Sequence, residues 1–201
     1  EGRYVTPGFI DMSNHSDTHL TMFRYPRLES MVMQGVTTIV GGNCGASLAP
    51  LASDRSIHAI DKWADPSLIN INWNTTGEYL DEAAKLRLGI NYATFTGYGT
   101  LRRGVMGDAI RPLTPEEFQK VKYLLSQSIS EGSRGISLGL AYGHERISPI
   151  DEIIEVCRAL KGTDGIIKVH LKSEGGELLG AINEIIRLAR ASEAPIEISH
   201  L

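Results

Sequence analysis

Cysteine is scarce in this sequence, with two in 201 residues. That number is too small for the disulfide framework of a small secreted domain. No apolar run reaches the ~18 residues of a membrane-spanning helix, and no signal-like segment is visible. We expect no membrane partner, and we also expect a cytoplasmic location, on which the missing signal segment has little bearing.

An excess of basic residues is also missing. Lys and Arg number 20 against 24 Asp and Glu, so the formal net charge is -4 and the pI is near 5.9. A nucleic-acid-binding domain needs a basic surface, so nucleic acid is not an expected partner. Gly41, Gly42 and Gly45 lack the spacing of a phosphate-binding loop, and we interpret them as turn glycines.

What the chain does have is an alternation of strand and helix patterns, with 42% hydrophobic residues to build a core. Three helices have clear ends. Thr114 and Glu117 form a capping box before an apolar stripe that stops at Gly132. The other two helices span residues 149–161 and 177–191. The expected strands are residues 5–11, 36–40, 90–96, 135–140, 165–169 and 195–199.

Strands that alternate with helices predict a parallel sheet. Six strands fit an open doubly wound sheet, or about six of the eight units of a (β/α)8 barrel, which takes roughly 250 residues. Residues 45–76 and 96–114 are less periodic, and we expect irregular excursions there. We interpret residues 1–201 as a catalytic barrel fragment, with the last two strands and a small β domain outside it.

Residues that can bind a metal follow four of these strands. They are His15, Cys44, His170 and His200. A parallel barrel gathers the carboxyl ends of its strands at one face, so these side chains are expected to converge, which favours the barrel over the open sheet. Thiolate and imidazole are ligands that zinc prefers, and a catalytic zinc uses three of them and leaves a fourth position open.

Other residues of these types have ordinary interpretations. His19, His58 and His144 are expected to be polar residues without a metal, and Cys157 a small apolar residue of a helix.

Seven stretches carry a family resemblance. They are TPGFID (residues 6–11), QGVTTIV (34–40), GNCGASLAP (42–50), GYGTLRR (97–103), GLAY (139–142), HLKSEG (170–175) and ISHL (198–201). In this order they resemble the amidohydrolase superfamily and, within it, the D-aminoacylase (N-acyl-D-amino-acid deacylase) family.

The resemblance implies a zinc-dependent hydrolase of amide bonds with an N-acyl amino acid as its small-molecule substrate. It places the tightly bound zinc on Cys44, His170 and His200. It also implies a catalytic aspartate on the eighth strand, which these residues do not include.

The sequence departs from the family pattern at three places. The first strand of the family is followed by a His-x-His pair, which here is Ser13 and His15, so a second metal position is weakened and His15 stays open as a ligand. Tyr98 replaces the histidine of a Gly-His-Gly motif. The turn after Tyr142 lacks its proline and reads Gly-His-Glu.

Arg102, Tyr98 and Tyr142 are candidate substrate-binding residues. Arg102 fits either a carboxylate clamp or a structural ion pair. Glu174 is either an acceptor that orients a histidine ligand or an acidic residue in the first turn of a helix. The predicted function is hydrolysis of N-acyl-D-amino acids or related amides. The alternative, supported by Ser13, is a barrel that has lost catalysis and acts as a binding protein.

Overall fold

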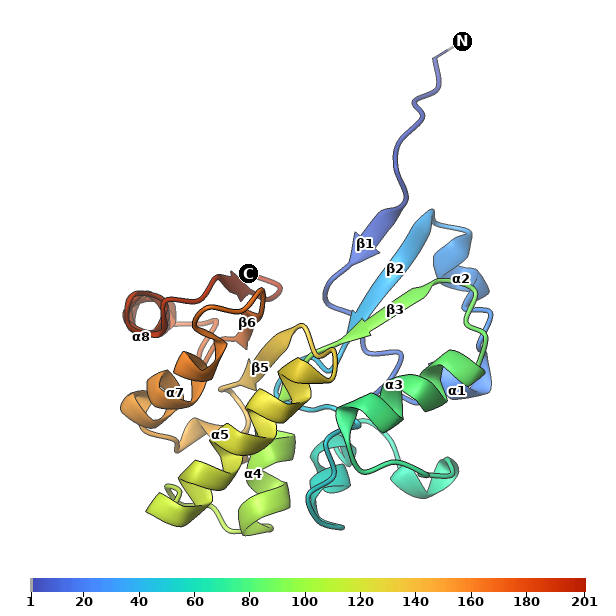
Figure 1. Cartoon of the computed structure of the whole chain (residues 1–201). Helices are drawn as coiled ribbons and strands as arrows, with labels where there is room; N and C mark the ends of the chain where they lie inside the picture. Colours follow the sequence, from blue (N-terminus) through green and yellow to red (C-terminus); the bar gives the residue numbers. More distant parts are fainter. Residues whose placement is uncertain (1) are drawn as a thin grey trace.

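The computed structural model describes residues 2–201 as one parallel β-structure with helices on its outer side (Figure 1). Its strands are β1 (Phe9–Asp11), β2 (Val36–Gly41), β3 (Asn91–Thr94), β4 (Thr96–Gly97), β5 (Gly135–Gly139), β6 (Ile166–His170) and β7 (Ile196–Ile198). Every strand pair is parallel, and neighbours in space are neighbours in sequence.

Two hydrogen-bonded sheets share the strand predicted at residues 90–96. Its first part is β3, in the sheet β1-β2-β3, and its second part is β4, in the sheet β4-β5-β6-β7. Phe95 lies between the two parts and donates its backbone N–H to the carbonyl of Gly41 at 3.0 Å. The six predicted runs are therefore all present, in order, with ends shifted by a few residues.

Within residues 2–201, eight α-helices and three 3₁₀ helices connect these strands. The α-helices are α1 (Thr21–Arg24), α2 (Glu29–Val32), α3 (Thr76–Lys85), α4 (Tyr98–Met106), α5 (Pro115–Ser130), α6 (Gly143–Arg146), α7 (Ile150–Cys157) and α8 (Leu178–Ser192). The 3₁₀ helices are Ser56–Ile60, Pro66–Leu68 and Arg158–Leu160. None of the helices in residues 2–201 has both the length and the apolar character needed to cross a membrane.

The predicted capping box of α5 is confirmed. Glu117 donates its backbone N–H to the Thr114 hydroxyl at 3.3 Å, and its carboxylate accepts the N–H of Thr114 at 2.8 Å. One prediction was wrong, because residues 96–114 are not an irregular excursion. They contain α4, whose Tyr98 and Leu101 are buried in the core.

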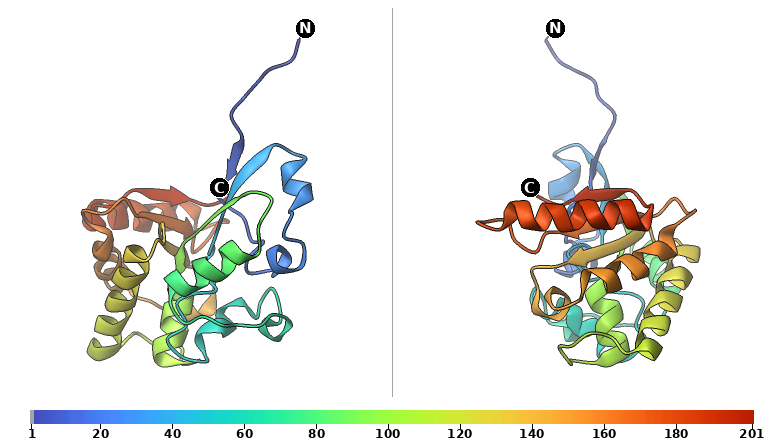
Figure 2. Two further views of the ribbon diagram at one scale, coloured as in Figure 1. Left: turned by 45° about the vertical axis from the view of Figure 1, so that its right-hand side comes forward. Right: turned by 90° about the vertical axis from the view of Figure 1, so that its left-hand side faces the viewer.

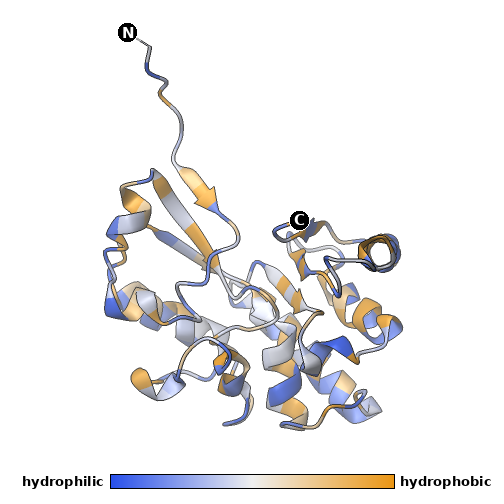
Figure 3. Ribbon diagram, turned by 180° about the vertical axis from the view of Figure 1, so that it is seen from behind, coloured by the Kyte–Doolittle hydropathy of each residue, from blue (hydrophilic) through white to orange (hydrophobic). Residues whose placement is uncertain are grey.

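The main core lies between the second sheet and helices α4, α5, α7 and α8 (Figures 1 and 2). Alternate residues of β5 and β6, among them Ile136, Leu138 and Val169, are fully buried against these helices. The first sheet has less cover at its edge. Phe9 and Ile10 of β1 are 56% and 61% exposed, and Figure 3 shows β1 as a hydrophobic arrow at the margin of the fold.

Candidate metal centre

Cys44 lies in a tight loop that follows β2. Gly42 and Gly45 have φ values of 70° and 74°, and a Cβ on Gly42 would lie 2.1 Å from the Phe95 carbonyl. The loop is tied to the second sheet by Ser137 of β5, whose hydroxyl contacts both Gly42 and Gly45. The turn role predicted for these two glycines is confirmed, and their conformations aim Cys44 toward β6.

The structure brings Cys44, His170 and His200 together. His170 is the last residue of β6, and His200 lies two residues after β7. One possible ligand atom from each residue lies within 4.8 Å of the other two. Cys44 Sγ is 3.5 Å from His170 Nδ1, and the two imidazole ring centroids are 4.5 Å apart.

These distances suit a zinc ion. Zn–S and Zn–N bonds of about 2.3 and 2.0–2.1 Å at a tetrahedral angle put sulfur and nitrogen about 3.5 Å apart, which is the separation of Cys44 Sγ and His170 Nδ1. Burial raises the pKa of the Cys44 thiol to about 11 and lowers the pKa of His170. The imidazole is therefore neutral at pH 7 and able to ligate, while the thiol needs a bound cation to lose its proton.

Glu174 contacts one of the three residues. Its carboxylate lies 2.9 Å from His200 Nδ1, which leaves the other ring nitrogen free for a metal. Helix α8 begins at Leu178, so Glu174 is not in its first turn. Of the two interpretations, the contact supports an acceptor that orients a histidine ligand.

His15 and Ser13 are not brought into this group. His15 Nδ1 lies 3.0 Å from the Thr18 hydroxyl, and its ring centroid is 4.7 Å from that of Trp63. Burial, together with the neighbouring histidines and Lys62, lowers the pKa of His15 to about 4. Ser13 is exposed, and its backbone N–H donates to the Asp11 carboxylate.

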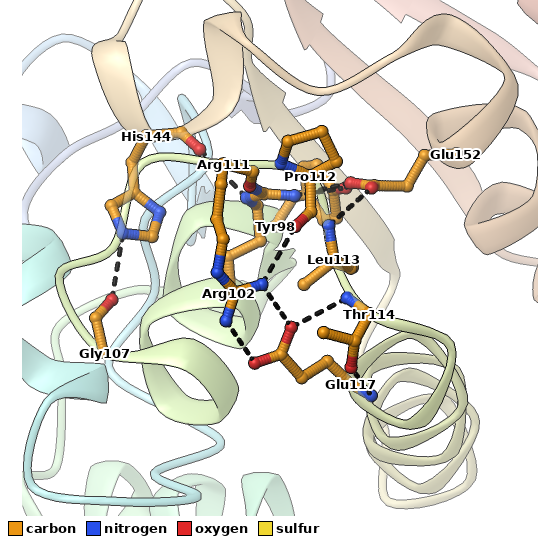
Figure 4. A network of polar contacts seen from close by, with 10 residues as sticks. All are labelled: Tyr98, Arg102, Gly107, Arg111, Pro112, Leu113, Thr114, Glu117, His144 and Glu152. Atoms are coloured by element: carbon orange, nitrogen blue, oxygen red, sulfur yellow. Dashed lines mark hydrogen bonds and ion pairs between the residues drawn. The ribbon is translucent and has the colours of Figure 1, made fainter.

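Two of the three candidate substrate residues lie elsewhere (Figure 4). Arg102 is fully buried, and its guanidinium donates to the carbonyls of His144 and Arg111 and to the Glu152 carboxylate. Tyr98 donates its hydroxyl to the same carboxylate at 2.5 Å. Arg102 is thus the structural ion pair, and the substrate role expected for it and for Tyr98 is not supported. Their spacing of four residues on one helix face would have indicated this, had α4 been predicted.

Tyr142 does lie beside the cluster, with its ring centroid 5.2 Å from that of His170. The sequence did not point to its neighbour Lys62, whose Nζ lies 3.4 Å from the centroid of the Tyr142 ring and 4.2 Å from that of Trp63. The ammonium end of Lys62 is partly shielded from solvent, and this loss of solvent lowers its pKa to about 8. The residue as a whole is exposed. Lys62 comes from the irregular stretch 45–76, where no periodic pattern predicts which side chains face the site.

Glu145 was also missed as a site residue. Its buried carboxylate accepts the N–H of Gly139 at 2.7 Å and lies against Gly45 and Gly99, where added Cβ atoms would meet it at 1.8 and 2.8 Å. Burial raises the pKa of Glu145 to about 7. Lys62, Tyr142 and Glu145 share a cavity of about 270 Å³ with other residues of this region. A larger hollow, of about 660 Å³, lies along residues 16–31 and includes none of the cluster.

Comparison with known proteins places this geometry in a family. A sequence model described as "Amidohydrolase family" matches residues 1–140. The chain belongs to the amidohydrolase family. Two curated relatives come from Alcaligenes xylosoxydans xylosoxydans. A D-aminoacylase is 36% identical over 99% of this chain, and an N-acyl-D-aspartate deacylase is 34% identical over 99% of it.

The chain also superimposes on solved structures. A crystal structure of D-aminoacylase matches 96% of this chain with a TM-score of 0.86 and 35% identity. N-acyl-D-glutamate deacylase from Bordetella bronchiseptica, complexed with zinc and a phosphonate inhibitor, matches 94% with a TM-score of 0.82 and 26% identity. The predicted barrel class is therefore confirmed. The chain spans about 40% of the length of these relatives.

Proposed function

We propose that the protein carrying this chain is a zinc-dependent hydrolase that cleaves the amide bond of N-acyl-D-amino acids. The observation that carries the proposal is the convergence of Cys44, His170 and His200 from three strand ends within 4.8 Å. The named relatives, D-aminoacylase and the N-acyl-D-aspartate and N-acyl-D-glutamate deacylases, support the substrate class.

The residues of the cluster and its neighbours would have different roles in this reaction. Cys44, His170 and His200 would hold the metal, which when bound supplies Lewis acidity to polarise an amide carbonyl and acidify water. Cys44 would hold the metal as the thiolate, so its thiol proton would be released to solvent. Glu174 fixes the ring of His200 through Nδ1. Tyr142 forms the wall beside His170. The general base stays a prediction, as an aspartate on the eighth strand.

The first test is metal content. The intact protein purified without chelator is expected to hold about one zinc, and Cys44→Ala to lose most of it, because thiolate is one of three protein ligands. Cys157→Ala is the matched control, since Cys157 is buried in α7 among apolar residues. Elemental analysis that finds no zinc, or equal zinc in both variants, would refute the metal site.

Activity separates the hydrolase from the binding-protein alternative. Release of free amino acid is followed with paired N-acetyl-D and N-acetyl-L substrates, and the D series is expected to be cleaved. His200→Ala is expected to abolish turnover. A zinc-loaded protein that cleaves neither series would favour a binding role.

A further inference from the structure

Lys62 places a cation one aromatic ring away from the metal cluster. Its Nζ lies 3.5 Å from the carbonyl of Cys44 and 3.4 Å from the centroid of the Tyr142 ring. The Tyr142 ring also lies near the metal cluster, because its centroid is 5.2 Å from that of the His170 ring. These contacts hold the ammonium in place, and Lys62 lines a cavity that a ligand could enter.

The acidic groups of this cavity already have other partners. Asp61 lies 2.8 Å from His58 Nδ1, and Glu145 accepts the backbone N–H of Gly139. Arg103, the other cation of the cavity, is paired with Asp108. Within residues 2–201, no carboxylate lies within salt-bridge distance of Lys62. Its contacts are two aromatic rings and a main-chain carbonyl, and the Glu145 carboxylate of the same cavity, whose pKa burial raises to about 7, is not within salt-bridge distance of it.

We propose that Lys62 determines specificity by binding a carboxylate of the substrate while the scissile amide lies at Cys44, His170 and His200. This inference rests on the hydrolase function proposed above. In an N-acyl amino acid, the amide carbonyl and the α-carboxylate are separated only by the amide nitrogen and the α-carbon. A cation one ring away from the metal ligands is within reach of such a group, or of the carboxylate of an acidic side chain.

The aromatic rings explain why the ammonium is in place before the substrate binds. Trp63 and Tyr142 both attract the cation through their π faces, so little side-chain entropy is lost when a carboxylate binds. An ammonium is a compact point charge with three donors, and it places few geometric demands on its partner. The site therefore selects for charge, and the carboxylate can come from either position on the substrate.

The experiment compares Lys62→Met with Lys120→Met in the intact, zinc-loaded protein. Methionine keeps an unbranched side chain against the rings and removes the charge. Lys120 is exposed on α5 and supplies the same chemical change away from the cavity. To test the side-chain carboxylate, N-acetyl-D-glutamate is compared with N-acetyl-D-glutamine. To test the α-carboxylate, each of these acids is compared with its α-carboxamide.

Lys62→Met is expected to raise KM about tenfold for the substrate that carries the recognised carboxylate, as for loss of a charge-assisted hydrogen bond. The kcat and the KM of the matched neutral substrate should change little. Lys62→Arg should recover most of the difference, and Lys120→Met should behave as the unsubstituted protein. The pair of substrates that shows the loss identifies which carboxylate is bound.

Two results would overturn the inference and leave the hydrolase intact: equal changes for charged and neutral substrates, or no change at all in Lys62→Met. If the unsubstituted protein cleaves no substrate while zinc is bound, the proposed function fails. Calorimetric titration of N-acetyl-D-glutamate then still tests Lys62, and equal affinity of both proteins, or binding to neither, refutes its role.

Discussion

Cys44 occupies a backbone conformation that its residue type disfavours. Its φ of 53° lies in the left-handed region, which costs a residue with a Cβ roughly 1–2 kcal/mol. The cost is offset by the surrounding loop, in which the Asn43 side chain donates to the carbonyls of Asn14 and Val40 at 2.9 and 2.7 Å. The loop therefore holds Cys44, between Asn43 and Gly45, in a conformation that its residue type disfavours.

Glu174 offers a prediction at the same scale. Glu174→Gln removes the negative charge beside His200 Nδ1 but keeps an acceptor, so zinc affinity should fall by roughly 10- to 100-fold, as for other residues that orient metal ligands. Competition with a chromophoric chelator measures the change in the intact protein.

Glu116→Gln on the exposed first turn of α5 is the control for that measurement. An unchanged zinc affinity in Glu174→Gln would mean that the contact with His200 is incidental.

Site residues that follow regular strands could be predicted from the sequence, and those in irregular segments could not. Cys44, His170 and His200 follow regular strands, and parallel strands present their carboxyl ends together, so sequence order was enough to predict their convergence. Lys62 comes from a stretch without periodicity and could not be placed. The role of Arg102 stayed open because α4 was not predicted, and Gly99 and Gly104 lower the helix propensity of that segment.

At the scale of elements, Glu145 joins segments that are distant in sequence. Its carboxylate lies against Gly45 after β2, Gly99 in α4 and Gly139 at the end of β5. The strands and α5 were predictable from local patterns, namely alternating apolar runs and a capping box. The contact of Glu145 with three glycines was not, because it depends on which strand ends become neighbours.

Glu145 predicts a pH dependence of stability. Its pKa is raised by burial from 4.5 to about 7, so the folded state binds this proton more tightly than the unfolded state. The resulting stabilisation is present below pH 4.5 and is lost as pH rises through about 7, with a total on the order of 3 kcal/mol.

Denaturant unfolding of the metal-free protein, with and without Glu145→Gln, checks this expectation between pH 4.5 and 8. The free energy of unfolding of the unsubstituted protein should fall relative to that of the variant as pH rises. Parallel curves for the two proteins would show that Glu145 titrates normally.

At the scale of the whole molecule, the two outer strands have unpaired edges. Within residues 2–201, β1 pairs only with β2, and β7 pairs only with β6. Phe9 and Ile10 of β1 are exposed (Figure 3). Apolar strand edges of this kind favour association with other chains.

We therefore expect residues 1–201, expressed without the rest of a barrel, to aggregate or to pack loosely and to show no hydrolysis. Sedimentation and thermal unfolding measure this directly. A monomer with a sharp cooperative transition would show that strands β1 to β7 are sufficient for a closed core.

The division of the β-structure into two sheets gives the metal a role beyond chemistry. Cys44 extends from the sheet β1-β2-β3, whereas His170 and His200 extend from the sheet β4-β5-β6-β7. An ion held by all three would cross-link the two sheets and fix the angle between them. Metal affinity and that angle are then thermodynamically linked. A substrate that favours one angle must also change how tightly the ion is held, and by the same factor the ion changes how tightly the substrate binds.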